Sequence, residues 1–372
     1  MKVVTIVGTR PELIKLSRVI PELDRSAQHV LVHTGQNYDY ELNEIFFKDL
    51  GLRRPDHFLE VAEASLGETI GNVVARSYAV LQQERPDAVL LLGDTNSCLS
   101  AISAKRLQIP IFHMEAGNRC FDERVPEEVN RRIVDHTADI NLPYTEHARR
   151  YLLAEGIRPE TVIKTGSPMR EVLEHYRPGI EGSDVLQRLG LESDRYFVAS
   201  AHREENVDSD ANLNDLLDTL RAVAERHRMP VIVSTHPRTM KRLEAIGGLA
   251  TADAIRFLKP LGFFDYVRLE IGAFCVLSDS GTITEECSIL GFSAVTIRQA
   301  HERPEGMDVG TLVMSGLKAE RVLDSIDLVR RHRDEGRRSR IAADYEADDV
   351  SAKVVRIILS YTDYVNRRVW MK

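Results

Sequence analysis

The chain has 372 residues, of which 43% are hydrophobic and 28% are charged. This length exceeds what a single hydrophobic core normally supports, and the composition is that of an ordinary globular protein. We therefore expect two domains and little disorder. The formal net charge of -8 argues against broad binding to nucleic acid or to an anionic membrane surface.

Cysteine usage and the N-terminus indicate a cytoplasmic protein. The four cysteines are scattered without a C-x-x-C spacing, so neither a zinc site nor a disulfide framework is expected. The N-terminal apolar run Val3–Val7 is too short for a signal peptide. The sequence also has no run of about 18 apolar residues, so no membrane-spanning helix is expected.

The first half alternates short β-branched runs with longer periodic stretches, which predicts parallel strands joined by helices. The predicted strands are Val3–Val7, Val30–His33, Ala88–Leu92, Ile111–Met114, Ile140–Leu142 and Val162–Ile163. The first four end in glycine or a polar cluster, as expected where parallel strands lead into ligand-binding loops.

The same pattern restarts near residue 195 and predicts a second sheet of the same type. Its predicted strands are Tyr196–Ser200, Val231–Ser234, Ile255–Phe257, Cys275–Leu277, Ala294–Ile297 and Thr311–Met314. The Pro- and Gly-containing stretch Tyr176–Ser183 is interpreted as a connector.

We thus predict an α/β protein of two facing Rossmann-like domains with parallel sheets. The first domain spans residues 1–170 and the second spans residues 171–350. A C-terminal helix over residues 351–372 is expected to pack back on the first domain. A nucleotide would bind one wall of the cleft between the domains, opposite the reacting group.

A nucleotide-binding segment is predicted in the second domain. Ser278–Glu286 follows an apolar strand and precedes a periodic stretch, so Ser280 is placed to cap a helix. The free amides of that helix would suit a diphosphate, and Glu286 could accept hydrogen bonds from ribose hydroxyls. Arg303 adds a cation beside this site. A plain helix cap and a solvated charge cluster are the alternatives.

The first domain has a similar turn at Gly8–Glu12, with Pro11 fit for the first helical position. Arg10 and Lys15 would be two cations near a phosphate path, although a surface cation is the alternative for Arg10. No G-x-G-x-x-G follows the first strand, which weakens a dinucleotide-binding interpretation.

Asp94, Glu115 and Glu127 are candidate acid–base groups, because they occupy loops or strand ends where solubility alone would not require them. Carboxylates that converge in a partly dry cleft can exchange protons near neutral pH. For each one alone, a turn or a helix cap is the alternative. His202 ends the first strand of the second domain and could titrate near neutral pH, although a structural role is the alternative.

Taken together, these segments resemble the non-hydrolysing UDP-N-acetylglucosamine 2-epimerases, a family with the two-domain glycosyltransferase-B fold. The resemblance runs over nearly the whole chain. The motifs that carry it are Gly8–Glu12, Gly93–Thr95, His113–Gly117, Pro126–Arg131, His202–Arg203, Asp279–Gly281 with Glu285–Glu286, and Glu302–Glu305.

The resemblance implies roles for individual residues. Asp94, Glu115 and Glu127 match the family's acid–base carboxylates, with Arg131 near them and His202 facing the substrate. The remaining matches are Arg10 and Lys15 to a basic pair, Ser280, Gly281 and Glu286 to the UDP-holding helix start, and Tyr266 to an aromatic residue beside the uracil. The resemblance further implies a UDP-sugar substrate, a homodimer, and neither a cofactor nor a metal.

Three departures from common members resemble one branch of the family. Thr282 stands where a second glycine is usual, and the loop Gly117–Val125 differs from the usual one. With Ser200–Asp208, these variants resemble enzymes that form UDP-N-acetyl-L-fucosamine from its 6-deoxy-L-talose epimer for capsule or O-antigen. Thr34–Asp39 lacks the pattern seen where a second UDP-N-acetylglucosamine binds as activator, so allosteric activation is not expected.

The expected chemistry is elimination of UDP and its re-addition. Carbon 2 is not next to a carbonyl, so departure of UDP from carbon 1 must help to remove the carbon-2 proton. A bound 2-acetamidoglycal would result, and protonation from the other face requires a further acid–base group. The alternatives are a UDP-sugar glycosyltransferase of the same fold, a hydrolysing epimerase, and a nucleotide-sugar sensor without activity.

Overall fold

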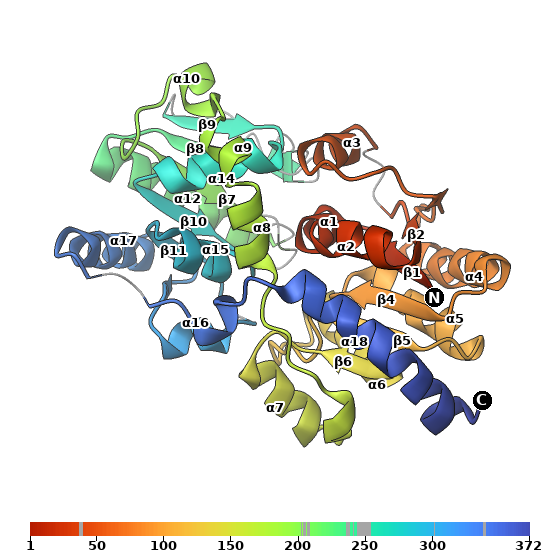
Figure 1. The fold of residues 1–372 in the computed structure, drawn as a ribbon. Coiled ribbons are helices and arrows are strands. Elements are labelled where there is room, and N and C mark those ends of the chain that lie inside the picture. The colour runs from red at the N-terminus through yellow and green to blue at the C-terminus, as the bar shows by residue number, and fades with distance from the viewer. Residues whose placement is uncertain are drawn as a thin grey trace. The chain divides into compact units, whose positions relative to one another are not determined.

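The structure is a computed structural model. It describes residues 1–36, 40–201, 203, 206, 209–235, 239–240, 242–243, 254–300, 302–337 and 340–372. The chain forms two compact units, of which the first comprises Met1–His175 with Ala343–Lys372 and the second comprises Tyr176–Ala342. Each unit contains a six-stranded parallel sheet with helices (Figure 1). The predicted α/β class with two Rossmann-like sheets is therefore confirmed.

The first unit has the strand order β3-β2-β1-β4-β5-β6. Its strands are β1 (Lys2–Val7), β2 (Gln28–His33), β3 (His57–Phe58), β4 (Ala88–Leu92), β5 (Ile111–Met114) and β6 (Ile140–Leu142). Its helices are α1 (Arg10–Leu16), α2 (Val19–Ser26), α3 (Tyr40–Asp49), α4 (Leu66–Glu84), α5 (Ser100–Arg106), α6 (Pro126–Thr137), α7 (Glu146–Ala154), α8 (Met169–His175) and α18 (Val350–Val365). Shorter helical turns are η1 (Asn96–Leu99), η2 (Pro159–Thr161), η3 (Ala343–Tyr345) and η4 (Asn366–Trp370).

The second unit repeats this arrangement with the order β12-β11-β10-β7-β8-β9. Its strands are β7 (Phe197–Ser200), β8 (Val231–Ser234), β9 (Ile255–Leu258), β10 (Cys275–Ser278), β11 (Ala294–Thr296) and β12 (Val313–Met314). Its helices are α9 (Arg177–Glu181), α10 (Val185–Leu189), α12 (Asp210–His227), α14 (Phe263–Gly272), α15 (Ile283–Leu290), α16 (Pro304–Asp308) and α17 (Ala319–Asp334).

The strand order reverses at one point in each sheet, between β1 and β4 in the first and between β7 and β10 in the second. In open parallel sheets the loops at this switch point diverge to opposite faces and leave space for a ligand beyond the carboxyl ends of the strands. The loops that follow these four strands are therefore where a site is expected in each unit.

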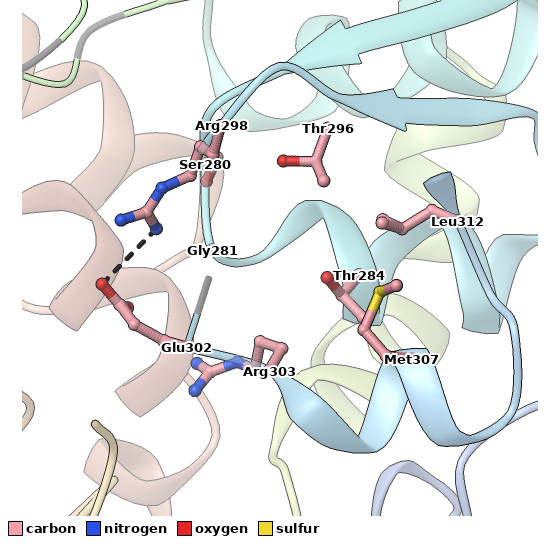
Figure 2. Close-up of a pocket in the computed structure, with 9 residues that line it drawn as sticks. All are labelled: Ser280, Gly281, Thr284, Thr296, Arg298, Glu302, Arg303, Met307 and Leu312. Atoms are coloured by element: carbon pink, nitrogen blue, oxygen red, sulfur yellow. Dashed lines mark hydrogen bonds and ion pairs between the residues drawn. The ribbon is translucent and has the colours of Figure 1, made fainter. Parts of the chain in front are cut away.

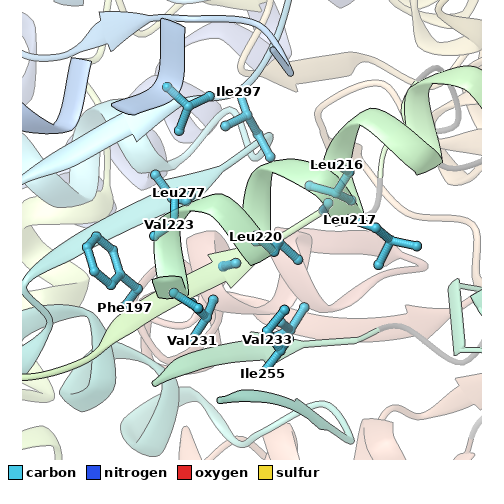
Figure 3. Close-up of a cluster of buried hydrophobic side chains, with 14 of the residues drawn as sticks. Phe197, Leu216, Leu217, Leu220, Val223, Val231, Val233, Ile255, Leu277 and Ile297 are labelled. Carbon is cyan, nitrogen blue, oxygen red and sulfur yellow. The ribbon is translucent and has the colours of Figure 1, made fainter. Parts of the chain in front are cut away.

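Alternation along the strands of the second unit divides its core into two layers. Phe197 and Leu277 belong to a cluster with Leu220 and Val223 of α12, shown in Figure 3. Val198 is next to Phe197 on β7, and Val276 is next to Leu277 on β10. These two valines belong to a separate cluster with residues of α14 and α15. Successive strand side chains point to opposite faces, so helices cover this sheet on both sides, and its strands lack a polar face.

One local prediction was wrong. Val162–Ile163 does not form a strand, because Val162 makes only an isolated bridge to Asn141. The sixth strand of that sheet is His57–Phe58, which is too short to produce an apolar run in the sequence. The predicted connector contains a short helix, Arg177–Glu181, because Pro178 falls in the first turn, where a missing backbone N–H costs nothing.

The C-terminal helix α18 belongs to the first unit and packs against α2. Figure 1 shows it in blue among the red to yellow elements of that unit. Beyond it, the ring of Trp370 lies under the Lys105 ammonium at 5.2 Å, a cation–π contact with α5. Within the described part of the chain, no helix has the length and apolarity needed to cross a bilayer.

The core of the second unit generates a stability prediction. Leu220→Ala should lower the free energy of unfolding by about 2–5 kcal/mol, because Leu220 is buried in the α12 cluster and its removal leaves a cavity. The neighbouring Arg221→Ala, on the exposed side of α12, should change it by less than about 0.5 kcal/mol. Urea unfolding followed by circular dichroism checks both, and equal losses would contradict the predicted core.

Candidate active site

Glu12 joins the loops that follow β1 and β4 at the switch point of the first unit. One carboxylate oxygen accepts the backbone N–H groups of Gly8 and, at 3.1 Å, Thr9. The other accepts the hydroxyls of Thr95 at 2.5 Å and Ser97 at 2.8 Å. Burial raises the pKa of Glu12, and these four donors act against that rise. The two loops therefore share one buried hydrogen-bonding centre.

Glu115 lies at the end of β5 in a left-handed backbone conformation, with φ of 63°. Its Oε2 is 2.5 Å from the Lys15 ammonium, and both side chains are buried. The Asn118 amide donates to Oε1 at 3.3 Å. A Cβ placed on Gly93 would lie 3.7 Å from Glu115 Oε2, so this carboxylate reaches the loop that carries Asp94.

Asp94 is held by helix α6. Its Oδ2 accepts from Arg131 at 2.9 Å through Nε and contacts Nη2 at 2.6 Å. The Asn130 amide donates to the Asp94 backbone carbonyl at 3.0 Å. Arg131 also donates to the buried carboxylate of Glu128 at 2.8 Å. Although burial raises the pKa of Glu128, its hydrogen bonds from Cys120 and the nearby arginines hold that pKa below the ordinary value.

The structure thus brings the three predicted carboxylates to neighbouring elements of the first unit. Asp94 follows β4, Glu115 directly follows β5, and Glu127 lies in the first turn of α6. Glu127 precedes Arg131 by four residues, so both lie on the same side of the helix. Because Arg131 binds Asp94, that side of α6 faces the end of β4.

The two predicted cations of this unit have different surroundings. Lys15 forms the buried ion pair with Glu115. The Arg10 guanidinium lies over the ring of Phe46 in α3, 5.5 Å from its centroid. Arg10 is half-buried and stays next to Gly8 and Thr9, whose backbone Glu12 holds.

In the second unit, Ser280 does not cap a helix as predicted. Helix α15 begins at Ile283, and Thr282 is the residue that precedes it. The Ser280 hydroxyl instead accepts the Thr282 backbone N–H at 3.3 Å and lies 2.9 Å from the Thr282 hydroxyl. A serine that bonds two residues ahead forms a turn rather than a cap, because its oxygen reaches only the nearest free N–H.

A pocket opens beside this turn (Figure 2). It is lined by Ser280, Gly281, Thr284, Thr296, Arg298, Glu302, Arg303, Met307 and Leu312.

The charged groups at this pocket are buried and lie close to one another. Glu302 lies 3.4 Å from Arg298 and 3.7 Å from Arg203. Arg303 is 3.4 Å from Glu285, which lies in the first turn of α15. With Arg203, Arg298 and Arg303 at one end of β10, this part of the unit suits an anionic group.

Behind the turn lies a buried acidic group that the sequence analysis did not single out. Glu270 of α14 is fully buried, and its neighbours include Glu286 and Tyr266. Burial raises the pKa of Glu270 well above its ordinary value, and the nearby Glu286 raises it further. Tyr266 shares this environment, and its hydroxyl lies near Ser200 at the end of β7.

His202, a predicted catalytic residue, lies outside the described residues. Among the residues that the structure does describe, no group of three histidine, cysteine or acidic side chains could hold a metal ion.

Sequence reasoning missed Glu12, Glu128, Asn130 and Glu270. Glu12 and Glu128 lie inside motifs that were recognised, but their patterns also fit ordinary helix N-termini, where acidic residues are common. Glu270 gave one weak signal, an acidic residue at an otherwise apolar position of a helix that follows the Gly262 turn.

Two parallel sheets of Rossmann-like order, each with polar groups at its switch point, define a protein of the glycosyltransferase-B structural class. A sequence profile of the UDP-N-acetylglucosamine 2-epimerase family matches residues 21–359. The chain belongs to this family, and is therefore an isomerase.

Solved structures agree with this assignment. The chain is 55% identical to the UDP-N-acetylglucosamine 2-epimerase from Rickettsia bellii, with a TM-score of 0.93 and coverage of 100% of both chains. It is 32% identical to the Methanocaldococcus jannaschii enzyme solved with UDP-GlcNAc and UDP, with a TM-score of 0.91 and coverage of 97% of this chain and 100% of that one.

One curated relative has a different sugar in its name. It is the UDP-2,3-diacetamido-2,3-dideoxy-D-glucuronate 2-epimerase from Pseudomonas aeruginosa, 32% identical over 331 residues, which are 87% of this chain and 91% of the relative. The predicted resemblance is thus confirmed at the level of the family.

Glu270 generates a prediction of pH dependence. Because its folded-state pKa is raised, the folded protein keeps a proton that the unfolded chain releases near pH 4.5. The free energy of unfolding should therefore fall as pH rises above that value, by up to about 1.4 kcal/mol per pH unit. Glu270→Gln should remove this fall, so that the variant gains stability relative to wild type between about pH 5 and pH 8.

Urea unfolding at several pH values checks this expectation. Glu192→Gln, at an exposed position of the same unit, is the matched control and should follow the wild-type profile closely. A difference between Glu270→Gln and wild type that stays constant with pH would contradict the prediction.

Proposed function

We propose that the protein is a non-hydrolysing UDP-N-acetylhexosamine 2-epimerase that works by elimination and re-addition of UDP. The observation that carries this proposal is the meeting of Asp94 and Glu115 at the ends of β4 and β5, each paired with a buried cation. A glycosyltransferase of the same class needs an acceptor site, whereas an epimerase needs several proton-transfer groups around one sugar.

The pairing with cations fixes the position of these carboxylates. Arg131 and Lys15 hold the carboxylates of Asp94 and Glu115 in place, and each carboxylate is proposed as a proton acceptor. One carboxylate takes the carbon-2 proton, a double bond forms between carbons 1 and 2, and the bond from carbon 1 to the diphosphate oxygen breaks with its electron pair on UDP. Protonation of carbon 2 from the opposite face and return of UDP to carbon 1 complete the epimerisation.

The second unit supplies groups that suit a departing diphosphate and its nucleoside. Ser280 and Gly281 present a polar turn beside Arg203 and Arg303, and cations near a leaving phosphate stabilise its developing charge. Glu286 is assigned to the ribose hydroxyls, and Tyr266 to the side of the uracil. The complex of the M. jannaschii enzyme with UDP-GlcNAc and UDP supports a UDP-sugar as the ligand.

For the sugar, we propose UDP-2-acetamido-2,6-dideoxy-L-talose, converted to UDP-N-acetyl-L-fucosamine for capsule or O-antigen. Support comes from Thr282, whose hydroxyl contacts Ser280, and from the distinctive loop Gly117–Val125. In that loop Arg119 is fully buried by ion pairs to Asp135 and Glu155. The relative from P. aeruginosa supports a family that contains enzymes for more than one sugar.

We further propose a homodimer in solution. The resemblance implies it, and apolar side chains are exposed on two helices that pack together, Ile102 on α5 and Val129 and Ile133 on α6. Light scattering after size-exclusion chromatography should give twice the mass of the chain. A mass of one chain would refute it.

Turnover in deuterated water tests the function. Without any acceptor, the protein should epimerise its UDP-sugar and introduce deuterium at carbon 2, as read by NMR and mass spectrometry. UDP-N-acetylglucosamine and the L-talo compound are compared side by side, and we expect faster exchange with the latter. Accumulating free UDP would identify a hydrolysing enzyme, and no turnover of either sugar would refute the proposal.

Asp94→Asn and Glu115→Gln should each lower kcat by about 10²- to 10⁴-fold, the usual contribution of an acid–base group. Affinity for UDP should change little, because the groups assigned to UDP lie in the second unit. Glu160→Gln removes a carboxylate that pairs with Arg158 at the surface of the same unit, and it should keep wild-type kcat. A nucleotide-sugar sensor would instead show no turnover, and these substitutions would leave its ligand binding intact.

A further inference from the structure

His113 occupies a buried position between two acceptors in the first unit. It lies on β5, two residues before Glu115, and only 1% of its surface is exposed. Its Nε2 is 2.8 Å from the backbone carbonyl oxygen of Gly93, the residue before Asp94. Its Nδ1 is 2.9 Å from Oδ1 of Asp135 on α6.

The partners determine where the protons of this ring are. A carbonyl oxygen can only accept, so Nε2 must carry a hydrogen to make the contact with Gly93. Both carboxylate oxygens of Asp135 already act as acceptors, Oδ2 for the Arg119 guanidinium at 2.7 Å and Oδ1 for the Gly117 backbone N–H at 3.2 Å. Because Nδ1 lies 2.9 Å from an oxygen that acts as an acceptor, this contact is favourable only if Nδ1 also carries a hydrogen.

His29 shows that burial beside a carboxylate does not by itself require this charge. Its Nδ1 lies 2.6 Å from Asp24, but its Nε2 lies 2.9 Å from the hydroxyl of Thr5, which can either donate or accept. A neutral ring satisfies both contacts. Burial accordingly lowers the pKa of His29, whereas at His113 the effect of burial is outweighed by Asp135 and Gly93, and its pKa is raised.

We propose that His113 is held as an imidazolium and acts as a positioning residue, fixing the Gly93–Asp94 peptide to Asp135 of α6. Asp94 is then held twice, through its side chain by Arg131 and through its preceding carbonyl by His113. The nearby acidic groups are Asp135 and Asp94, and Arg119 shares Asp135 with the ring. Glu155 pairs with Arg119 and balances the second buried cation.

The charge follows from contacts alone, whereas the positioning role rests on the proposed function. Two readouts therefore separate them. A carboxylate that must approach carbon 2 within a fraction of an ångström loses rate when its loop shifts, even if the substrate still binds. Loss of the contacts of His113 with Gly93 and Asp135 should thus lower kcat and leave KM nearly unchanged.

The charge is tested by NMR of protein with ¹⁵N-labelled histidine, with signals assigned from His113→Gln and His29→Gln. Above about pH 7, where an ordinary histidine is neutral, both ring nitrogens of His113 should remain protonated while His29 shows a single N–H. In Asp135→Asn the second proton of His113 should be lost at the same pH. A His113 ring with one proton in the wild-type protein would overturn the proposal, whether or not the protein epimerises any sugar.

The positioning role is tested by kinetics on whichever UDP-sugar is turned over. His113→Gln should lower kcat by about 10- to 100-fold and change KM by less than about threefold. His29→Gln also removes a buried histidine with an acidic partner, but at the opposite end of the sheet, and should keep wild-type kcat. A His113→Gln enzyme with wild-type kcat would overturn the positioning role, and if this variant fails to fold, Asp135→Asn provides the same comparison.

Discussion

The site in the first unit depends on one buried carboxylate, that of Glu12, which accepts four hydrogen bonds. Its donors come from the loops after β1 and β4, which a parallel sheet brings to the same edge and sends to opposite faces. Without a shared acceptor, those loops would leave backbone and hydroxyl donors unsatisfied in a dry environment, at a cost of about 1–3 kcal/mol each. Gly8 is required beside this centre, since a Cβ there would come within 2.5 Å of the Thr34 hydroxyl.

Several buried charged side chains lie at this edge of the first unit's sheet, and most of them are paired with a side chain of opposite charge. Glu115 is matched by Lys15, Asp94 and Glu128 share Arg131, and Asp135 receives Arg119 and faces His113. A buried ion is tolerable only when a partner offsets its lost hydration. Asp94 and Glu115 each have a cation beside them, which stabilises a carboxylate that is partly shielded from water.

The second unit handles charge in a different way. Arg203, Arg298 and Arg303 lie beside Glu302 or Glu285 near the turn at Ser280. Glu270 is instead buried beside a second acidic residue, Glu286, and Tyr266. The group of arginines favours an anionic ligand, since the guanidinium N–H groups can donate hydrogen bonds to it. Glu270 is a buried carboxyl whose neutral form is favoured, so the folded state is more stable when Glu270 keeps its proton.

The sequence by itself determined the α/β class, the repeated sheet and the family. Apolar runs, β-branched composition and the glycines and polar groups at strand ends are local properties that survive without knowledge of contacts. It also singled out Asp94, Glu115 and Glu127 as loop carboxylates. The tertiary structure decided the rest. It shows that His57–Phe58, too short for an apolar run, pairs with β2, and that Ser280 makes a turn instead of a cap. It also shows which groups form hydrogen bonds with Glu12 and His113. Thr95 and Ser97 lie 83 and 85 positions from Glu12 along the chain, and Gly93 lies 20 positions from His113. Whether a buried polar side chain is satisfied depends on such distant groups, and no local pattern encodes it.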